Sequence, residues 1–340
     1  MEAGTTRVDP SIEELIAAGR FDEAVDALAA VARTSADTDV AIRLVDLRAA
    51  AAAAHVPTAG RTPWPPPYAD PFPGVRGRVP EIPAAELTSD LLGGAVTHHG
   101  ALVVRGVASP AQVEAAVATI DAVQELHDRG EAGAAPDPRW FRPLDTPRSK
   151  DRVLRQIVRD QGGTWLADSP AATALLLDAL AEMRITGCIA GHLGERPFFS
   201  LQKSTLRRSL PVFNLVAWHQ DGSFLDPEVR TMNVWLALSR CGGSASDSPA
   251  LEVVPRRIDE ILPVDGVMSP HSVSYDLVAE LAVDTPTTIP AFEPGDAILF
   301  DEHFLHQTHL SEGMTSTRYA LECWFFAPSH QSPNYLPLLA

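Results

Sequence analysis

The residues with the clearest capacity for chemistry are a histidine and an aspartate two positions apart, His219 and Asp221. On an extended segment, side chains two apart point to the same face, so the imidazole and the carboxylate would lie together. They supply two of the three ligands of a 2-His-1-carboxylate facial triad, which leaves positions on Fe(II) open for oxygen chemistry. Because a His-X-Asp pair often occurs by chance, a second histidine is needed to support this interpretation.

Three histidines in the last part of the chain compete to be this third ligand: His303, His306 and His309. They follow a tight turn and a buried strand at 294–300, which would deliver the ligand from the opposite side of a barrel. Being three apart, they would alternate faces on a strand, whereas in a loop any of them could coordinate a metal. Arg318 follows on what is predicted to be the next strand. The residues alone leave the choice of histidine open.

Composition and charge limit the classes of protein to which this chain can belong. The chain has 340 residues, 45% hydrophobic and 21% charged, which is enough for one large globular domain plus an appendage. Its formal net charge of −17 argues against a nucleic-acid or membrane surface as partner. The three cysteines lie far apart without a CxxC motif, which disfavours both a disulfide framework and a cysteine-rich zinc site. With no signal-peptide pattern and no apolar run long enough to span a bilayer, we expect a cytoplasmic protein.

The chain is predicted to divide into three parts. Residues 1–56 show helical spacing of apolar residues and predict an α-helical extension, serving as a cap or as the arm of a homodimer. Residues 57–83 hold nine of the 29 prolines and predict an extended linker whose aromatic residues pack along the main domain. Residues 84–340 then form the main domain.

Within the main domain, helices are predicted before most of the strands. A buried strand at 101–107 precedes a helix that starts at Ser109-Pro110, a long loop at 129–150 and a second helix at 169–193. Short strands separated by proline and glycine turns follow, which predicts a sandwich or jelly roll with the helices on one outer face. The predicted strands of this second half are 198–203, 212–218, 231–238, 251–254, 286–290, 297–300 and 318–326.

Four separated motifs make the chain resemble the phytanoyl-CoA dioxygenase family, a branch of the Fe(II)/2-oxoglutarate-dependent oxygenases. They are Trp218-His219-Gln220-Asp221-Gly222, the turn and strand at 294–300, Leu305-His306 and Arg318, in that order. The segment 100–107 also resembles the first core strand of the family, and the similarity covers roughly residues 82–328. The resemblance implies an α+β protein, namely a double-stranded β-helix (jelly roll) with flanking helices and an N-terminal α-helical extension.

The resemblance also assigns the catalytic metal site. His219, Asp221 and His306 would bind Fe(II), which favours His306 over His303 and His309 as the third ligand. Cupin-type metalloenzymes that do not use 2-oxoglutarate are an alternative, but they usually employ more histidines. A non-catalytic binding or scaffold protein with a decayed oxygenase domain is a second alternative, against which the complete triad argues.

Four further residues are implied to bind the cosubstrate. Arg318 would grip the distal carboxylate of 2-oxoglutarate with paired charge-assisted bonds, for which a planar guanidinium is suited. Gln202 matches a position that often contacts this cosubstrate, and Trp235 matches an aromatic residue of its pocket. Thr308 lies two residues past the third ligand, on the same face, and could reach a carboxylate oxygen. A cupin would have no reason to carry this arginine.

The implied reaction is oxidation of a small molecule by O2 and 2-oxoglutarate, with release of succinate and CO2. Because Asp221 keeps a carboxylate that halogenating relatives replace with a small residue, hydroxylation of a C–H bond is preferred over halogenation. A natural-product substrate is expected, although desaturation, epoxidation and cyclisation use the same chemistry. The Ser-His that relatives carry after the Trp-bearing strand is missing here, so their substrates do not transfer. The residues expected to line the substrate pocket are Arg207, Arg208, Phe224, His309 and Trp324.

Overall fold

Eleven strands among the described residues form two sheets that enclose the site. The computed structural model describes residues 11–35, 37–57, 60, 62–131, 152–211, 216–243, 246–332 and 334–340. The strands are β1 (Glu81–Pro83), β2 (Ala101–Arg105), β3 (Gly163–Trp165), β4 (Phe198–Ser200), β5 (Thr205–Ser209), β6 (Thr231–Ala237), β7 (Ala250–Val253), β8 (Ala297–Phe300), β9 (His306–His309), β10 (Arg318–Phe326) and β11 (Pro337–Leu339). The helices are α1 (Ile12–Ala17), α2 (Phe21–Thr34), α3 (Thr38–Ala54), α4 (Ser89–His99), α5 (Pro110–Glu131), α6 (Arg152–Asp160), α7 (Pro170–Glu182), α8 (Ile185–Leu193) and α9 (Tyr275–Leu281).

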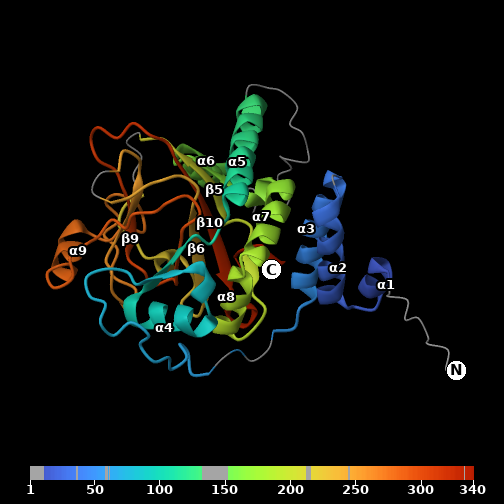
Figure 1. Cartoon of the computed structure of the whole chain (residues 1–340), viewed down its shortest axis with the longest axis horizontal. Coiled ribbons are helices and arrows are strands. Elements are labelled where there is room, and N and C mark those ends of the chain that lie inside the picture. The colour runs from blue at the N-terminus through green and yellow to red at the C-terminus, as the bar shows by residue number, and fades with distance from the viewer. Residues whose placement is uncertain are drawn as a thin grey trace.

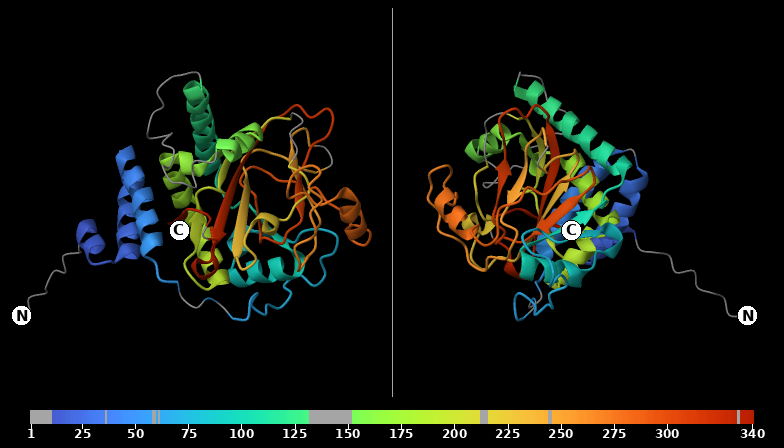
Figure 2. Two further views of the ribbon diagram at one scale, coloured as in Figure 1. Left: turned by 180° about the vertical axis from the view of Figure 1, so that it is seen from behind. Right: turned by 60° about the vertical axis from the view of Figure 1, so that its left-hand side comes forward.

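The large sheet has the strand order β1-β2-β8-β6-β10-β4-β11, with β5 also pairing with β10 and β3 with β5. The small sheet consists of β7 and β9. Among these strands only β1 and β2 pair in parallel. Helices α4, α5, α7 and α8 lie on one side of the large sheet, and the small sheet and α9 lie on the other (Figures 1 and 2). The architecture is the expected double-stranded β-helix with flanking helices, and its large sheet is open.

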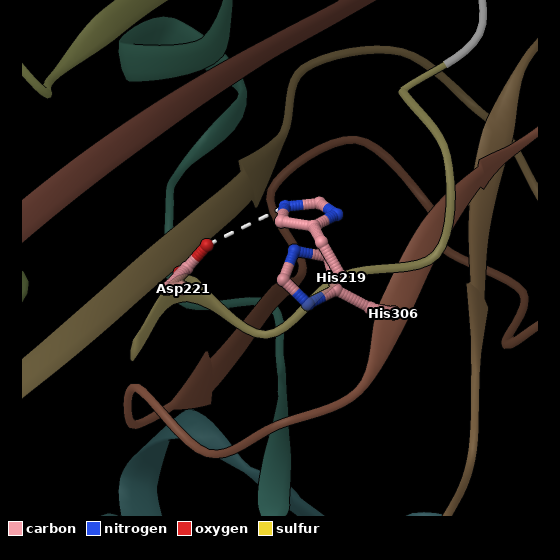
Figure 3. Close-up of side chains that lie close together, drawn as sticks. All are labelled: His219, Asp221 and His306. Carbon is pink, nitrogen blue, oxygen red and sulfur yellow. Dashed lines mark ion pairs between the residues drawn. The ribbon is translucent and has the colours of Figure 1, made fainter. Parts of the chain in front are cut away.

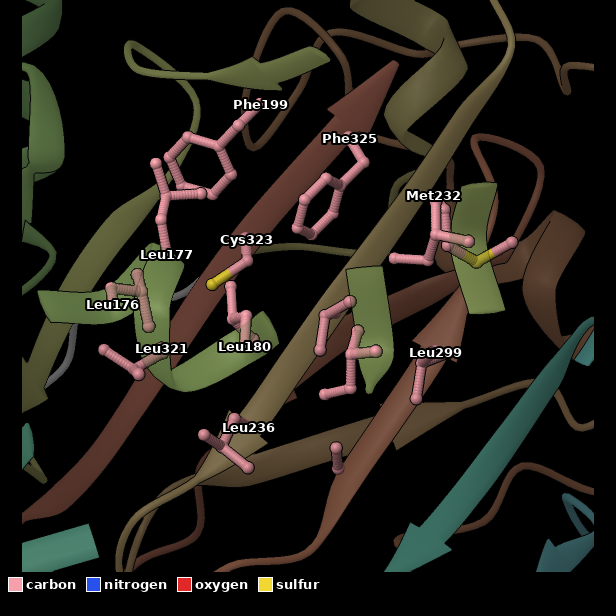
Figure 4. Close-up of a cluster of buried hydrophobic side chains, with 14 of the residues drawn as sticks. Leu176, Leu177, Leu180, Phe199, Met232, Leu236, Leu299, Leu321, Cys323 and Phe325 are labelled. Atoms are coloured by element: carbon pink, nitrogen blue, oxygen red, sulfur yellow. The ribbon is translucent and has the colours of Figure 1, made fainter. Parts of the chain in front are cut away.

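Alternate side chains of the large sheet enter two different cores, because neighbouring strand residues point to opposite faces. Leu236, Leu321 and Phe325 pack with residues of α7 and α8 in the main hydrophobic cluster (Figure 4). Trp235 and Ala320, on the opposite face, pack toward the small sheet with residues of β7. The residues of β5, β6 and β10 that share this second face form the floor of the site described below.

The N-terminal helices pack against the main domain. The cluster that contains the buried residues of α2 and α3 also contains Phe198 and Leu339. Arg48 donates a 2.6 Å hydrogen bond to the carbonyl of Leu339, the end of the last strand. In the proline-rich segment, Trp64 and Phe72 pack against the main core. The boundaries 1–56, 57–83 and 84–340, like the homodimer arm, stay predictions.

Strands β8 and β10 begin and end where the sequence predicts, but other elements differ. The single helix expected at 169–193 is two helices, because Arg184 adopts a left-handed backbone conformation with φ of 63°. Residues 286–290 contain no strand beyond one bridge from Thr288 to Val253, since Pro286 and Pro290 cannot donate to a ladder. Residues 212–215 of a predicted strand, and 132–150 of the predicted loop, lie outside the described residues.

Three further observations complete the fold. Within the described ranges, no helix combines the length and the apolar character needed to cross a bilayer. Cys188, Cys241 and Cys323 are buried free thiols. Gly295, in the turn before β8, has a φ of 97° and approaches the carbonyl of Ala108 closely, so the predicted tight turn depends on glycine.

Helix α7 offers a matched pair of leucines for a test of the core. Leu180 is 0% exposed in the main cluster, whereas Leu175 on the same helix is 56% exposed. Leu180→Ala is expected to lower the free energy of unfolding by about 2–5 kcal/mol, because it removes buried methyl groups and leaves a cavity. Leu175→Ala should change it by less than about 0.5 kcal/mol. Urea unfolding followed by circular dichroism measures both, and equal effects would contradict this packing of α7.

Candidate active site

Two histidines from distant parts of the chain are held side by side by the backbone. The amide of His219 donates to the carbonyl of His306 at 3.0 Å, and the amide of His306 donates back at 3.1 Å. This isolated antiparallel bridge places the two ring centroids 4.3 Å apart. His306 begins β9, so the small sheet supplies its ring. The other ring comes from the extended segment that contains His219.

Asp221 reaches the same point in a way that strand alternation did not predict. It begins a short 3-10 turn (Asp221–Phe224), so the chain is no longer extended at this residue. The turn is anchored by a 2.8 Å hydrogen bond from the amide of Gly222 to the carbonyl of Glu302. A Cβ at position 222 would lie 2.4 Å from the terminal methyl of Ile261 and 3.1 Å from the carbonyl oxygen of Glu302, so a larger residue would require Ile261 to move.

The three side chains His219, Asp221 and His306 form one compact group (Figure 3). Their potential ligand atoms all lie within 4.8 Å of one another, and Nε2 of His219 is 3.5 Å from Oδ1 of Asp221. The Nδ1 atoms point at the carbonyls of Ala217 and Phe304, at 2.8 and 2.9 Å. An Nδ1–H that donates to a carbonyl leaves Nε2 with its lone pair, which is the usual state of a metal-binding histidine.

Two neighbouring features support metal binding by this group. Burial and the imidazole of His219 lower the pKa of His306 to about 4, so its ring is neutral at ordinary pH. Asn233 on β6 donates a 3.2 Å hydrogen bond to Oδ2 of Asp221, which leaves Oδ1 facing the histidines. The sequence gives no sign of this contact between Asn233 and Asp221.

The two competing histidines lie elsewhere. His303 belongs to a separate group with Asp301 and Glu302, and its Nδ1 is 3.5 Å from Oε1 of Glu302. Asp301 is already paired with Arg257, and burial raises the pKa of Glu302 to about 8.

His309 faces a different carboxylate, since its Nδ1 is 3.5 Å from Oε2 of Glu252. It does not line the cavity next to the triad, although the sequence predicted that it would. Its side chain projects from β9 three residues after His306, where strand alternation turns it away from the ligands. Neither competing histidine therefore joins His219 and Asp221.

Arg318 is a buried cation with unused donors. Only 3% of it is exposed, and its Nη2 donates to Oγ of Ser209 at 3.2 Å. Its Nε and Nη1 are buried without a hydrogen-bond partner among the described residues. Burial lowers the pKa of this guanidinium from its usual value. Unpaired buried donors are costly, so this geometry fits a carboxylate ligand that accepts from two nitrogens.

A cavity of about 760 Å³ joins the triad to Arg318. This volume is within the range of ordinary small-molecule sites. The strand register explains the shared lining: Arg318 pairs with Ser209, Glu322 with Thr205 and Trp235, and all of these side chains lie on one face. The other sequence-predicted residues that line it are Gln202, Trp235, Thr308, Arg207, Arg208, Phe224 and Trp324.

The contacts of three of these wall residues show how much capacity each has left to bind a ligand. The side-chain oxygen of Gln202 accepts a 3.1 Å hydrogen bond from the amide of Leu336, so this residue is fixed in place. The indole nitrogen of Trp235 is buried and has no hydrogen-bond partner among the described residues, and Arg318 lies 5.5 Å from its ring centroid. Arg207 is bound to Glu322 at 2.9 and 3.0 Å, which leaves it little capacity for a ligand. Lys203, which the sequence analysis missed, also lines the cavity.

Comparison with known proteins gives a family match and several structures of low similarity. The family model described as phytanoyl-CoA dioxygenase (PhyH) matches residues 96–314. Among curated proteins, none matches this sequence.

Three solved structures illustrate the low similarity. EvdO2 from Micromonospora carbonacea var. aurantiaca, complexed with 2-oxoglutarate, is 18% identical over 67% of this chain and 86% of its own, with a TM-score of 0.44. EctD from S. alaskensis, with 2-oxoglutarate and 5-hydroxyectoine, is 17% identical over 70% and 79%, with a TM-score of 0.45. SnoK, a non-heme alpha ketoglutarate dependent carbocyclase from nogalamycin biosynthesis, is 16% identical over 72% and 85%, also with a TM-score of 0.45.

Proposed function

This chain belongs to the phytanoyl-CoA dioxygenase family of Fe(II)/2-oxoglutarate-dependent oxygenases, and from that premise we propose that His219, Asp221 and His306 are its ferrous ligands. Membership makes the protein a dioxygenase that uses Fe(II), 2-oxoglutarate and O2. The observation that carries the assignment is the compact triad, with both Nδ1 atoms turned to backbone carbonyls. Two imidazoles and one carboxylate are the donor set that ferrous oxygenases use.

We further propose that Arg318 binds the distal carboxylate of 2-oxoglutarate. Its two unpartnered nitrogens support this role, and Trp235 would form the adjoining wall. Thr308 and Gln202 would contribute polar contacts to the same molecule, since both line the cavity. When bound, the ferrous ion with its cosubstrate and O2 supplies the oxidant for a substrate bond, with succinate and CO2 as coproducts.

The protein's own part in the reaction is binding and orientation. Asn233 fixes the rotation of the Asp221 carboxylate, and the backbone bridge fixes the two histidines relative to each other. Outer contacts of this kind typically affect metal affinity by about 10- to 100-fold. Trp235, Phe224 and Trp324 line the cavity with aromatic surface, which would limit the access of water to the reacting bond.

We propose that the substrate is a small molecule, such as a natural-product intermediate, and that a C–H bond is hydroxylated. The cavity volume of about 760 Å³ supports a ligand of this size beside the cosubstrate. The carboxylate of Asp221, held by Asn233, occupies the place that halogenation would require to be vacant, which supports hydroxylation.

Anaerobic titration of the wild-type protein tests the proposed use of Fe(II) and 2-oxoglutarate. The purified protein should bind one Fe(II) per chain and develop a weak visible charge-transfer band when 2-oxoglutarate is added. Aerobic turnover should then release succinate, because the cosubstrate is consumed. Iron binding without the band or succinate would favour a cupin-type enzyme, and failure to bind iron would favour a non-catalytic protein.

A further inference from the structure

Lys203 is a cation inside the cavity that the metal and cosubstrate sites do not use. It lies in the turn between β4 and β5, and its side chain lines the cavity. Its Nζ is 3.9 Å from the ring centroid of Phe224, 5.7 Å from that of Trp324 and 5.4 Å from that of Tyr335. Among the described residues, no carboxylate or hydrogen-bond acceptor pairs with this ammonium group.

The other cations of the cavity are already accounted for. Arg207 is held by Glu322, which also accepts a 2.8 Å hydrogen bond from Thr205. Arg208 is paired with Asp121 at 3.1 Å, and Arg159 is paired with Asp128. The two carboxylates that act electrostatically on Lys203 have other partners, since Glu322 binds Arg207 and Asp221 belongs to the triad. The aromatic rings give this lysine cation–π contacts, but no residue in the described ranges forms an ion pair with it.

Lys203 is also close to the reacting centre. Phe224, the ring nearest to its Nζ, is stacked with the imidazole of His219, at 6.3 Å between centroids and 25° between planes. An anion bound to Nζ would thus be held about one aromatic ring away from a ferrous ligand. This places neighbouring carbon atoms of the same molecule next to the metal site.

The cosubstrate does not need this lysine. In the proposed site, Arg318 would hold the distal carboxylate of 2-oxoglutarate and the metal held by the triad would bind its keto acid end, so both of its acidic groups would be engaged. Arg318 and Trp324 lie six residues apart on β10, which corresponds to roughly 20 Å along a strand. Lys203 borders the Trp324 end of this face, so its anion belongs to another molecule.

We propose that Lys203 binds a carboxylate of the primary substrate, which makes the substrate class small carboxylic acids with an apolar or aromatic body. This inference rests on the proposed function of the same site. A partly buried ammonium without a counter-ion gains most from a charge-assisted bond to an anion. The rings of Phe224, Trp324 and Tyr335 suit the apolar body, and the oxidised carbon is expected within a few bonds of the carboxylate.

Binding of matched probes tests the proposal without turnover. The protein is loaded anaerobically with Fe(II) and N-oxalylglycine, an unreactive analogue of 2-oxoglutarate, so that Arg318 is occupied. Benzoate, hexanoate and 2-naphthoate are titrated by calorimetry beside their neutral amides. At least one carboxylate should bind about tenfold or more tightly than its amide, since only the carboxylate pairs with the ammonium.

Three variants identify the cation responsible. Lys203→Met should reduce the preference for the carboxylate to less than about twofold, and Lys203→Arg should retain it, because it keeps the charge. Arg240→Met is the control: it removes a positive charge from an exposed residue that is paired with Glu293 and does not line the cavity. It should leave the preference unchanged.

The outcomes separate this inference from the proposed function. If the wild-type protein does not take up Fe(II) and N-oxalylglycine, the proposed function fails. If it takes up both but prefers no carboxylate to its amide in the three pairs, or if Lys203→Met keeps the preference, the inference is overturned. A loss of about tenfold or more in N-oxalylglycine affinity in Lys203→Met would assign Lys203 to the cosubstrate and also overturn it.

Discussion

His306→Ala is expected to lose Fe(II) binding and turnover, whereas His303→Ala should retain both. The imidazole of His306 lies close enough to His219 and Asp221 to bind the same metal ion, whereas His303 faces Glu302 in a separate group. Removing one of three protein ligands should weaken Fe(II) binding by at least about 100-fold, the upper end of the effect of outer-shell partners. Competition with a chromophoric chelator under anaerobic conditions measures the affinity of each variant.

The pair of variants is informative because both remove an imidazole from the same short loop-and-strand segment. A general loss of stability from either substitution would appear in thermal unfolding, and it would lower iron binding in both proteins. Loss of iron in His303→Ala with retention in His306→Ala would show that the third ligand is assigned wrongly. His309→Ala, whose parent imidazole faces Glu252, should behave like the His303 variant.

The sequence predicted best those elements whose own residues are enough to identify them. Strand β8 is a run of four buried apolar residues after a glycine turn, and its bounds were predicted without error. Strand β5 was missed, because Thr-Leu-Arg-Arg-Ser has the composition of exposed chain. Its two arginines are tolerated next to the cavity only because Glu322 and Asp121 lie opposite them, from segments over 80 residues away. Such pairing is a property of the fold.

The candidate site shows the same division between local and distant signals. His219, Asp221 and Arg318 were proposed from motif and resemblance, and the structure brings the two ligands together while placing the arginine in the same cavity. The roles of Asn233 and Lys203 could not be read from the sequence. The role of each of these two residues depends on the side chains that the fold brings next to it, across the sheet or in the cavity.

Net charge likewise describes the surface and not the site. The value of −17 argued against polyanionic partners, yet Lys203 and Arg318 in the cavity are cations that pair with no carboxylate in the described part of the chain. Each of them has lost most of its hydration, and burial lowers the pKa of both, that of Lys203 to about 8. Two desolvated cations in one cavity fit two separate anions, one for the cosubstrate and one for the substrate.

Arg318→Met is expected to weaken 2-oxoglutarate binding by about 100-fold or more while Fe(II) affinity stays unchanged. The substitution removes two charge-assisted hydrogen bonds from a buried site, each contributing about 1.5–3 kcal/mol, and about 1.4 kcal/mol corresponds to a factor of ten. Arg318→Lys should recover little of the loss. An ammonium cannot grip both oxygens of the carboxylate in one plane, and it cannot keep the contacts with Ser209 and Trp235 together.

Anaerobic titration of the Fe(II)-loaded protein with 2-oxoglutarate, followed by the visible charge-transfer band, measures this affinity directly. Arg240→Lys is the control, because Arg240 is an exposed arginine that is paired with Glu293 and does not line the cavity, and its variant should titrate like the wild type. An affinity within about threefold of wild type in Arg318→Met would remove Arg318 from the cosubstrate site. The unpartnered Nε and Nη1 of Arg318 would then need another anion, and the substrate carboxylate proposed for Lys203 would be the first to test there.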